Sequence, residues 1–199
     1  MERLIDFDQH WLLYINSHNS SWADFLFWWI SDKYVWIPLY LLLTALLWRR
    51  FGWMNTLIML VGFGLAVGLS DFFTSGLLKP FFARLRPTHH PQLGSLIHIV
   101  NDYRGGRYGF PSSHASDTMA LGLLFSMIWK NKKATIPLMV WVAFNCYSRM
   151  YLGVHYPFDI LIGLLIGSFM AWLSYRVLYI VFDRIKVADG EAVNPLERS

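Results

Sequence analysis

Charged residues and cysteine are what this sequence has least of. Charged side chains make up only 15% of the 199 residues, whereas hydrophobic residues make up 55%. An ordinary soluble domain is about a quarter charged, and a soluble chain of this length has too little interior to bury so much apolar surface. The composition therefore indicates a membrane protein. The single cysteine, Cys146, excludes an internal disulfide and leaves the redox compartment open.

Three further features are missing. The formal net charge of +4 is modest, and the basic residues form no arm or stripe, so nucleic-acid binding is not indicated. The polar, acidic first residues do not resemble a cleavable signal peptide. We find no internal repeat and nothing that requires an obligate protein partner. We expect one membrane-embedded domain over residues 1–186, followed by a loose, polar, cytoplasmic tail over 187–199.

Long apolar runs are abundant and predict an all-α, polytopic membrane helix bundle. Five runs are long enough, or nearly so, to cross hydrocarbon about 30 Å thick. Basic residues between the first and second runs and between the third and fourth favour a cytoplasmic position for both connections, which places the N-terminus outside. Gly64 with Gly68, and Gly163 with Gly167, are spaced for close helix packing. The five runs are residues 34–49, 53–78, 115–130, 134–152 and 157–182.

Residues 1–31 are apolar but interrupted by polar side chains such as His10, Asn16 and Asp24. We expect one or two amphipathic helices lying on the outer interface. The alternative is a short sixth crossing, which would move the N-terminus inside.

A long polar loop over residues 79–114 follows the second run, and loops of this length are commonly functional. The positive-inside tendency predicts few basic residues on the outer side, but several occur there. An anionic ligand is the simplest reason to keep them. The outer basic residues are Lys79, Arg84, Arg86, Arg104, Arg107 and Arg149.

Two clusters in this loop suit an anion. Lys79 and Arg86 offer the ammonium and the guanidinium that bind phosphate oxygens, although snorkelling at a helix end is the alternative, and we keep that interpretation for Arg84. The segment Gly109–His114 has the pattern of a helix start, whose free N–H groups bind anions. A plain N-cap with a surface histidine is the alternative there.

A third cluster joins the fourth and fifth runs. It contains Ser148, Arg149, His155 and Asp159. A helical start would bring His155 and Asp159 together because they are four residues apart. The carboxylate would then hold one ring nitrogen and leave the other as a nucleophile. A metal site or a satisfied interfacial contact would use the same pair.

Together, Lys-x6-Arg-Pro, Pro-Ser-x-His and Ser-Arg-x5-His-x3-Asp resemble the three-part signature of the type 2 phosphatidic acid phosphatase superfamily. The resemblance runs from about Asp71 to Gly167. It implies a metal-free phosphatase without cofactor, in which His155 is the nucleophile, Asp159 orients it and His114 is the general acid. It also implies that the phosphate ligands are Lys79, Arg86, Ser112 and Arg149.

This chain has Ser113 where the family usually has glycine. Serine keeps the backbone N–H, so we expect activity to survive, and we count Ser113 among the phosphate-binding candidates. Asp71, one turn below Ser75 and two below Lys79, is expected to support the basic cluster from inside the membrane, and Ser148 is a second supporting candidate.

Other outer residues receive lesser roles. We expect Asp117 to complement the helix dipole and Arg104 and Arg107 to contact a head group. We expect the loop histidines His89, His90 and His98 to be solvated rather than to bind metal.

The resemblance indicates a lipid phosphatase in a bacterial cytoplasmic membrane with its active site facing outward. Undecaprenyl diphosphate is the first substrate candidate, followed by lipid A phosphate, phosphatidylglycerol phosphate and phosphatidic acid. A transporter would carry its charges along the membrane midplane, and here they gather at one face. Haloperoxidase chemistry on the same residues is disfavoured by the membrane spans, and a catalytically silent lipid-binding protein is disfavoured by the complete set of motif residues.

Overall fold

The computed structural model describes residues 2–189 and 194–197 of the chain. Within these residues it contains helices, one isolated bridge between Leu85 and Tyr108, and no β-strand, which confirms the expected all-α class. The main helices are α1 (Glu2–Ser17), α2 (Ser21–Ser31), α3 (Ile37–Phe51), α4 (Trp53–Asp71), α5 (Lys79–Phe82), α6 (Ser113–Trp129), α7 (Lys132–Tyr151) and α8 (Pro157–Asp189). Short 3₁₀ turns cover Lys33–Trp36, Pro87–His89 and Pro195–Glu197, and a π-helical segment covers Phe72–Leu78.

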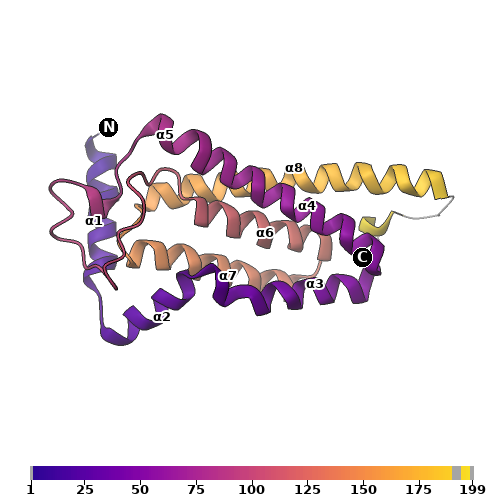
Figure 1. The fold of residues 1–199 in the computed structure, drawn as a ribbon, viewed down its shortest axis with the longest axis horizontal. Helices are drawn as coiled ribbons and strands as arrows, with labels where there is room; N and C mark the ends of the chain where they lie inside the picture. Colours follow the sequence, from indigo (N-terminus) through magenta and orange to yellow (C-terminus); the bar gives the residue numbers. More distant parts are fainter. Residues whose placement is uncertain (1, 190–193, 198–199) are drawn as a thin grey trace.

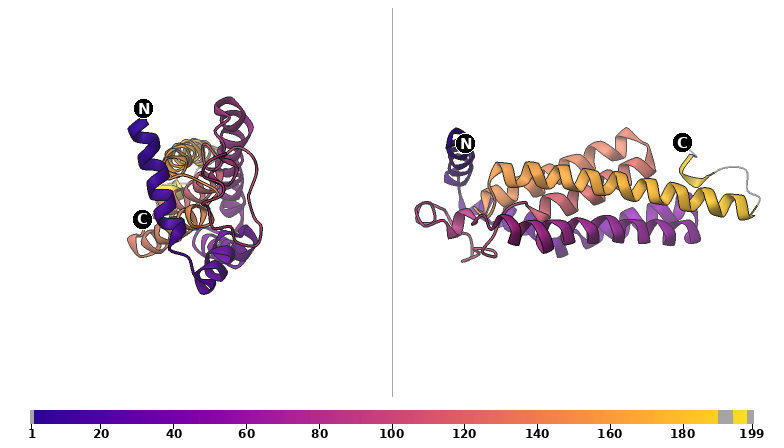
Figure 2. Two further views of the ribbon diagram at one scale, coloured as in Figure 1. Left: turned by 90° about the vertical axis from the view of Figure 1, so that its left-hand side faces the viewer. Right: turned by 90° about the horizontal axis from the view of Figure 1, so that it is seen from above.

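Helices α3, α4, α6, α7 and α8 run side by side along the long axis of the molecule (Figure 1). Helix α6 packs against α4, α7 and α8 and is the centre of the bundle. Helix α1 lies across one end of the bundle, where the loop after α5 also lies, as the end-on and top views show (Figure 2). The connections between α3 and α4 and between α6 and α7 lie at the opposite end.

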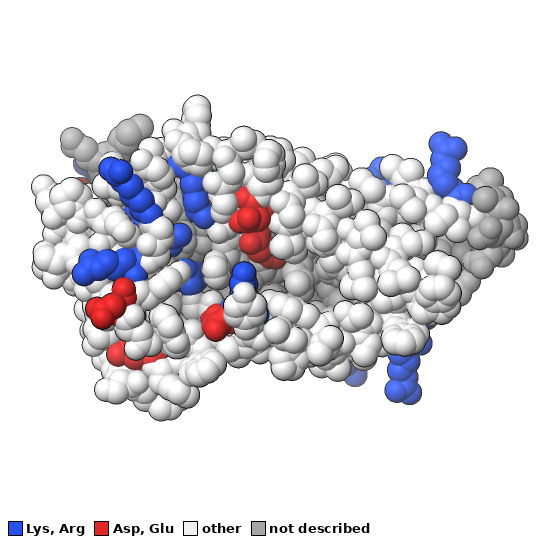
Figure 3. Space-filling model, in the orientation of Figure 1, with Lys and Arg blue, Asp and Glu red and all other residues white. Residues whose placement is uncertain are grey.

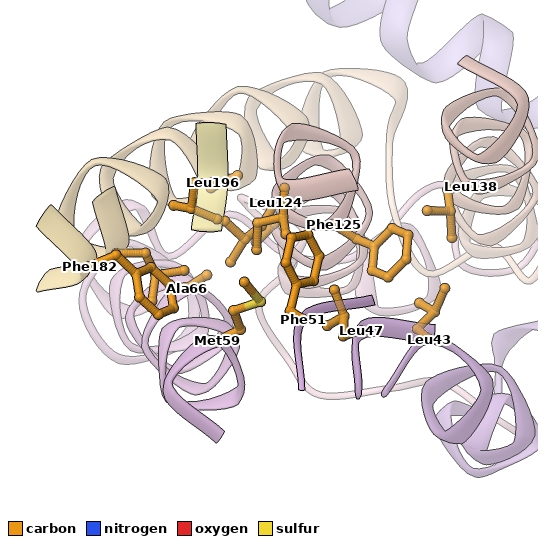
Figure 4. Packing of buried hydrophobic residues seen from close by; sticks show 14 residues of the cluster. Leu43, Leu47, Phe51, Met59, Ala66, Leu124, Phe125, Leu138, Phe182 and Leu196 are labelled. Atoms are coloured by element: carbon orange, nitrogen blue, oxygen red, sulfur yellow. The ribbon is translucent and has the colours of Figure 1, made fainter. Parts of the chain in front are cut away.

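The core forms where α6 meets its neighbours (Figure 4). Leu124 and Phe125 of α6 are buried against Leu47 of α3, Met59 of α4 and Phe182 of α8. Helices α3, α4 and α8 each have a second face on which large apolar side chains such as Leu41, Leu57 and Leu165 are exposed. A soluble fold could not leave so much apolar surface exposed to water.

Helix α6 approaches α8 closely because α8 carries glycine at the contact. A Cβ atom on Gly163 would overlap the backbone carbonyl oxygen of Ser112, the N-cap residue of α6, and one on Gly167 would overlap that of Ser116 in α6. These contacts confirm that pair as a packing site. The expectation is wrong for Gly64 and Gly68, since a Cβ atom there would meet nothing within 4 Å. The close glycine of α4 is instead Gly62, against Leu178.

Two helical stretches, Trp53–Phe82 and Pro157–Lys186, are long and apolar enough to cross a membrane, and the pair Ser21–Ser31 and Lys33–Phe51, bent by 66°, would be a third if it is one span. The count of five spans stays a prediction. Helix α6 is surrounded by protein and carries several polar residues at its start, so it needs less hydropathy than a lipid-facing helix. On the face seen in Figure 3, a broad uncharged zone separates the charged side chains of the two ends.

The N-terminal segment forms two helices, α1 and α2, where one or two were expected. Helix α1 buries Asp8, Leu12 and Asn16 and exposes Leu4 and Trp11. Its protein-facing side is therefore partly polar, and its exposed side carries large apolar side chains together with charged and polar ones such as Asp6 and His10. Such a mixed exposed side suits a helix at a membrane interface.

At the other end of the chain, the tail is not wholly loose. The Asn194 side chain donates to the Tyr179 carbonyl at 3.2 Å, Tyr179 donates to Glu197 at 2.6 Å, and Leu196 is buried. These contacts hold residues 194–197 against α8 and correct the expectation for that part. The remainder of the predicted tail beyond Asp189 lies outside the described residues.

Candidate active site

The three sequence clusters come together at the end of the bundle that α1 crosses. His155 lies between α7 and α8 and is 1% exposed. Its Nδ1 is 3.4 Å from Oδ2 of Asp159, in the first turn of α8, and the Tyr156 N–H donates to the same oxygen at 3.0 Å. The Ser112 N–H donates to the Asp159 carbonyl at 2.9 Å. This last bond joins the start of α6 to the start of α8.

Arg86 fixes the other side of the imidazole. Its Nη1 lies 3.1 Å from His155 Nε2 and donates to the Val154 carbonyl at 3.2 Å, while its Nε donates to the Tyr108 carbonyl at 3.2 Å. A guanidinium has only donors, so Nε2 must accept. In a neutral His155 the proton is then on Nδ1, facing Asp159.

Two loop glycines leave the space that Arg86 occupies. A Cβ atom on Gly105 would lie 3.0 Å from Arg86 Nη1, and Gly105 also has a positive φ of 66°. A Cβ atom on Gly109 would lie 3.1 Å from both Arg86 Cγ and Asp159 Oδ2. These contacts explain the glycines at positions 105 and 109, which the sequence did not single out.

Lys79 reaches the start of α6. Its ammonium donates to Ser113 Oγ at 2.9 Å and to Ser75 Oγ at 3.0 Å. The Ser112 hydroxyl accepts the Ala115 N–H at 3.4 Å and so caps α6. The helix-start interpretation of this segment is correct, and it brings Lys79 beside two hydroxyls.

The route to Lys79 differs from the expected straight helix. Helix α4 ends at Asp71 and continues through the π-helical segment Phe72–Leu78, which turns more widely than an α-helix. Asp71 is exposed, and the ion pairs of the described residues do not include Asp71 with Lys79. A supporting role for Asp71 stays a prediction.

Arg149 approaches from α7. It donates to the Ser31 hydroxyl through Nη1 and to the Tyr103 hydroxyl at 2.9 Å through Nη2. Its Nε is buried and has no partner within the part of the chain that the structure describes. A buried donor without a partner is costly, so this atom suits a ligand oxygen. Ser31 and Tyr103 gave no signal in the sequence.

His114 stands between two cavities. A cavity of about 260 Å³ is lined by His114, Ser31 and Tyr103 and by the charged residues Asp32, Lys33 and Arg149, among others. A mostly apolar groove of about 390 Å³, whose walls come from α3, α4, α6 and α7, shares His114 and Ser31 with it. The imidazole therefore lies where a charged region adjoins an apolar one.

Positive charge converges on His155. Burial, and then the charges of Arg86, Arg149 and Lys79, lower the pKa of His155 well below its ordinary value. Burial and the neighbouring Arg149 lower the pKa of Arg86 to about 10. Cations held this close repel one another, and a bound anion would relieve that repulsion.

Arg84 does not snorkel, contrary to the expectation. It donates to Asp8 Oδ2 at 2.6 Å and to Asp159 Oδ1 at 2.7 Å, and its guanidinium lies over the Tyr156 ring at 4.1 Å. Both carboxylates are buried, and the Arg84 side chain is 29% exposed, so two ion pairs hold the guanidinium against the protein. Neither Asp8 nor this use of Arg84 was predicted.

The residues to which the sequence gave lesser roles make contacts outside the cluster around His155. Ser148 is buried and donates to the Asn145 carbonyl at 2.7 Å, so its hydroxyl serves its own helix. His98 is not merely solvated, because it pairs with Asp24 at 3.0 Å. Arg104 is exposed and donates to the Thr88 carbonyl at 3.3 Å.

His89 Nδ1 lies 3.2 Å from the Thr88 hydroxyl, and His90 Nδ1 accepts the Leu93 N–H at 3.3 Å, so local bonds occupy both rings. Arg107 is exposed with its guanidinium 5.6 Å from the Tyr108 ring centre. Any head-group contact by Arg104 or Arg107 stays a prediction.

A protein-family model matches the part of the chain that contains all three sequence clusters. The model of the PAP2 superfamily matches residues 55–183. A lipid A 4'-phosphatase of Bacteroides thetaiotaomicron is 32% identical over 187 residues, covering 94% of this chain and 83% of its own length. A lipid A 4'-phosphatase of Porphyromonas gingivalis is 33% identical, covering 89% and 75%. An undecaprenyl-diphosphatase of Sulfolobus acidocaldarius is 29% identical, covering 73% and 64%.

The fold is also found among solved structures. A PAP2-type phosphatidylglycerolphosphate phosphatase from Bacillus subtilis superimposes with a TM-score of 0.66 at 21% identity, covering 87% of this chain and 85% of its own. At this identity the likeness concerns the fold alone. It shows that a helix bundle of this arrangement is shared with a transmembrane phosphatase.

Proposed function

The chain belongs to the PAP2 superfamily and is a membrane phosphatase, and we propose that it hydrolyses a lipid A-type phosphate through a phosphohistidine on His155. The observation that carries the proposal is the position of His114, between the cationic cavity beside Arg149 and the apolar groove. A lipid phosphate needs both regions at once, with its phosphate in the first and its hydrocarbon in the second.

The geometry supports a two-step reaction. When Arg86 turns its donor from His155 Nε2 to a phosphate oxygen, the freed Nε2 lone pair attacks phosphorus while the bond from phosphorus to the lipid oxygen breaks. His114 gives its proton to that leaving oxygen. A water then loses a proton to His114 and attacks the phosphohistidine, which releases inorganic phosphate and restores His155.

The remaining groups stabilise charge. We assign Lys79, Arg86 and Arg149 to the phosphate oxygens, where three cations offset the negative charge of the transition state. The N–H groups and hydroxyls of Ser112 and Ser113 at the start of α6 would add donors. No step in this reaction requires a metal ion or a cofactor.

The substrate order differs from the one expected from the sequence. Lipid A phosphate becomes the first candidate, because two relatives that act on it align with at least 89% of this chain. Undecaprenyl diphosphate becomes the second candidate, supported by a relative that aligns with 73%. Phosphatidylglycerol phosphate and phosphatidic acid follow.

We place the enzyme in a bacterial cytoplasmic membrane with its site facing outward. His155 belongs to the connection between α7 and α8. The connections between α3 and α4 and between α6 and α7, beside which Arg49, Arg50 and Lys130–Lys133 stand in the sequence, lie at the opposite end of the bundle (Figure 1). The positive-inside tendency assigns that end to the cytoplasm. In this arrangement α3, α4, α6, α7 and α8 are the five spans.

The test is phosphate release by the purified protein in detergent. Lipid A, undecaprenyl diphosphate and phosphatidic acid would be compared with EDTA present. His155→Asn is the test variant, and His10→Asn, at an exposed position on α1, is the matched control. We expect fastest release from lipid A, full loss in His155→Asn and no loss in His10→Asn.

Radioactive phosphate trapped on the protein should be stable to alkali and labile to acid, and absent from His155→Asn. Activity that survives in His155→Asn, or that EDTA abolishes, would contradict the mechanism. Faster release from undecaprenyl diphosphate than from lipid A would reverse the substrate order.

A further inference from the structure

Helix α1 enters the site through one buried carboxylate. Asp8 is 1% exposed, although it belongs to a helix that otherwise lies on the outer end of the bundle. Its Oδ1 accepts the Phe158 N–H at 2.8 Å, and its Oδ2 accepts from Arg84 at 2.6 Å. Phe158 lies in the first turn of α8, where backbone N–H groups have no partner within the helix. Asp8 therefore caps the helix that carries Asp159.

Arg84 is shared between two carboxylates. One Nη atom donates to Asp8 and the other to Asp159 Oδ1, at 2.6 and 2.7 Å. The second oxygen of Asp159 faces His155 Nδ1. Asp8, Arg84, Asp159 and His155 thus form one continuous row of contacts, and its first member comes from a helix far from the others in the chain.

We propose that Asp8 and Arg84 are positioning residues that set the orientation and charge of Asp159, and through it the reactivity of His155. This inference rests on the proposed function. It makes α1 a working part of the catalytic apparatus as well as an interfacial helix.

The reason is electrostatic balance. Arg84 by itself would neutralise Asp159 and weaken the field that this carboxylate exerts on His155. The negative charge of Asp8 offsets part of the positive charge of Arg84, so more of the negative charge of Asp159 acts on His155. The other groups whose charges act on the imidazole are Arg86, Arg149, Lys79 and His114, and all four stay constant in the variants below.

Two variants give opposite expectations. Asp8→Asn keeps an oxygen for the Phe158 N–H but removes the charge, so Arg84 acts fully on Asp159 and His155 becomes less basic. Arg84→Gln removes the cation, so His155 becomes more basic. The acidic limb of the kcat profile should therefore move to lower pH in Asp8→Asn and to higher pH in Arg84→Gln, each by about half a pH unit.

The experiment measures kcat and KM against pH at saturating lipid A in detergent, where the ionisation of the substrate is common to all variants. Asp8→Asn should lower kcat about tenfold, as expected for a bond to a charged group, with KM within about twofold because the phosphate ligands are intact. Asp8→Glu should recover part of kcat. Asp6→Asn, two residues away at an exposed position, is the matched control and should match wild type.

If Asp8 and Arg84 only stabilised the fold, the two variants would give a different result. Their yield and activity would fall, but their acidic limbs would not move in opposite directions. The proposal is overturned if the acidic limb of the kcat profile lies at the same pH in wild type, Asp8→Asn and Arg84→Gln. It is also overturned if the acidic limb moves in the same direction in both variants. If Asp8→Asn does not fold, an unmoved limb in Arg84→Gln overturns it alone.

The proposed function and the positioning role fail differently. An inactive wild type refutes the proposed function, and the positioning role falls with it. An active wild type with an inactive His155→Asn, but with unmoved limbs in the two positioning variants, refutes only the positioning role.

Discussion

The contact between α6 and α8 offers a sharp test of how packing positions the site. We consider Gly163→Ala, which adds one methyl group to α8. The new Cβ would lie 3.1 Å from the Ala115 Cβ and would overlap the Ser112 carbonyl oxygen. Because that oxygen is backbone, it has no rotamer by which to move away. The two helices have to separate.

The size of the effect follows from that geometry. Ordinary van der Waals contact begins at 3.4 Å, so the start of α6 would move away from α8 by roughly 1 Å, a displacement that costs about a hundredfold in rate. The same movement stretches the 2.9 Å bond from the Ser112 N–H to the Asp159 carbonyl. Overpacking of this kind costs about 1–3 kcal/mol of stability, or roughly 4–8 °C in thermal midpoint at its centre.

The assay is kcat/KM for lipid phosphate release together with the thermal midpoint, both on the monodisperse fraction in detergent. Gly64→Ala is the matched control, since its Cβ meets nothing within 4 Å on α4, and it should match wild type. Gly167→Ala overpacks the same interface one turn further from the site. It should lose stability like Gly163→Ala but lose less activity.

One result would refute the reasoning. If Gly163→Ala keeps kcat/KM within about threefold of Gly64→Ala, and melts at the same temperature, then the close approach of α6 and α8 does not position the site. The contact would then relax without moving Asp159.

Three further expectations concern the cationic cluster. Ser113→Gly removes a hydroxyl that accepts from Lys79 at 2.9 Å but keeps the backbone N–H, so kcat/KM in steady-state assays should change less than about threefold. Tyr103→Phe removes the 2.9 Å partner of Arg149, and KM should rise about fivefold with little change in kcat. Because its pKa is lowered in the folded state, His155 stays neutral when the unfolded chain takes up a proton below about pH 6.5. Folding stability should therefore fall from pH 7 to pH 5 by up to about 1.4 kcal/mol per unit, and a melting series should show a smaller fall in His155→Asn.

The helices and the pairing of His155 with Asp159 could be predicted because both depend on local sequence. Apolar runs define the helices, and a spacing of four residues at a helix start defines the pair. The observed bounds agree with the five predicted runs to within a few residues, with two exceptions. Helix α4 ends at Asp71 and the rest of the second run is the π-helical segment Phe72–Leu78, and α8 extends to Asp189. Residues that are close in sequence can take few positions relative to one another, so their contacts are easier to predict.

The contacts of the charged groups were harder to predict because their partners are distant in the chain. Arg149 meets Ser31 across 118 residues, and Arg84 meets Asp8 across 76 residues. A lone arginine near a membrane surface has the same local pattern whether it snorkels or forms an ion pair. Only the tertiary structure distinguishes the two.

The amino-acid pattern of helix α1 explains why its contact with the site was not predicted from the sequence. In a soluble protein the apolar side of a helix packs inward, and polar residues such as Asp8 and Asn16 would mark the solvent side. At a membrane interface lipid covers the apolar side, and the polar residues are free to face protein. Asn16 does so, with bonds to the carbonyls of His98 and Tyr151 at 3.0 and 2.7 Å. Two of the polar residues of α1, Asp8 and Asn16, therefore lie on its packed face, whereas His10 is exposed. Asp8 is the buried residue that brings a charge to the site.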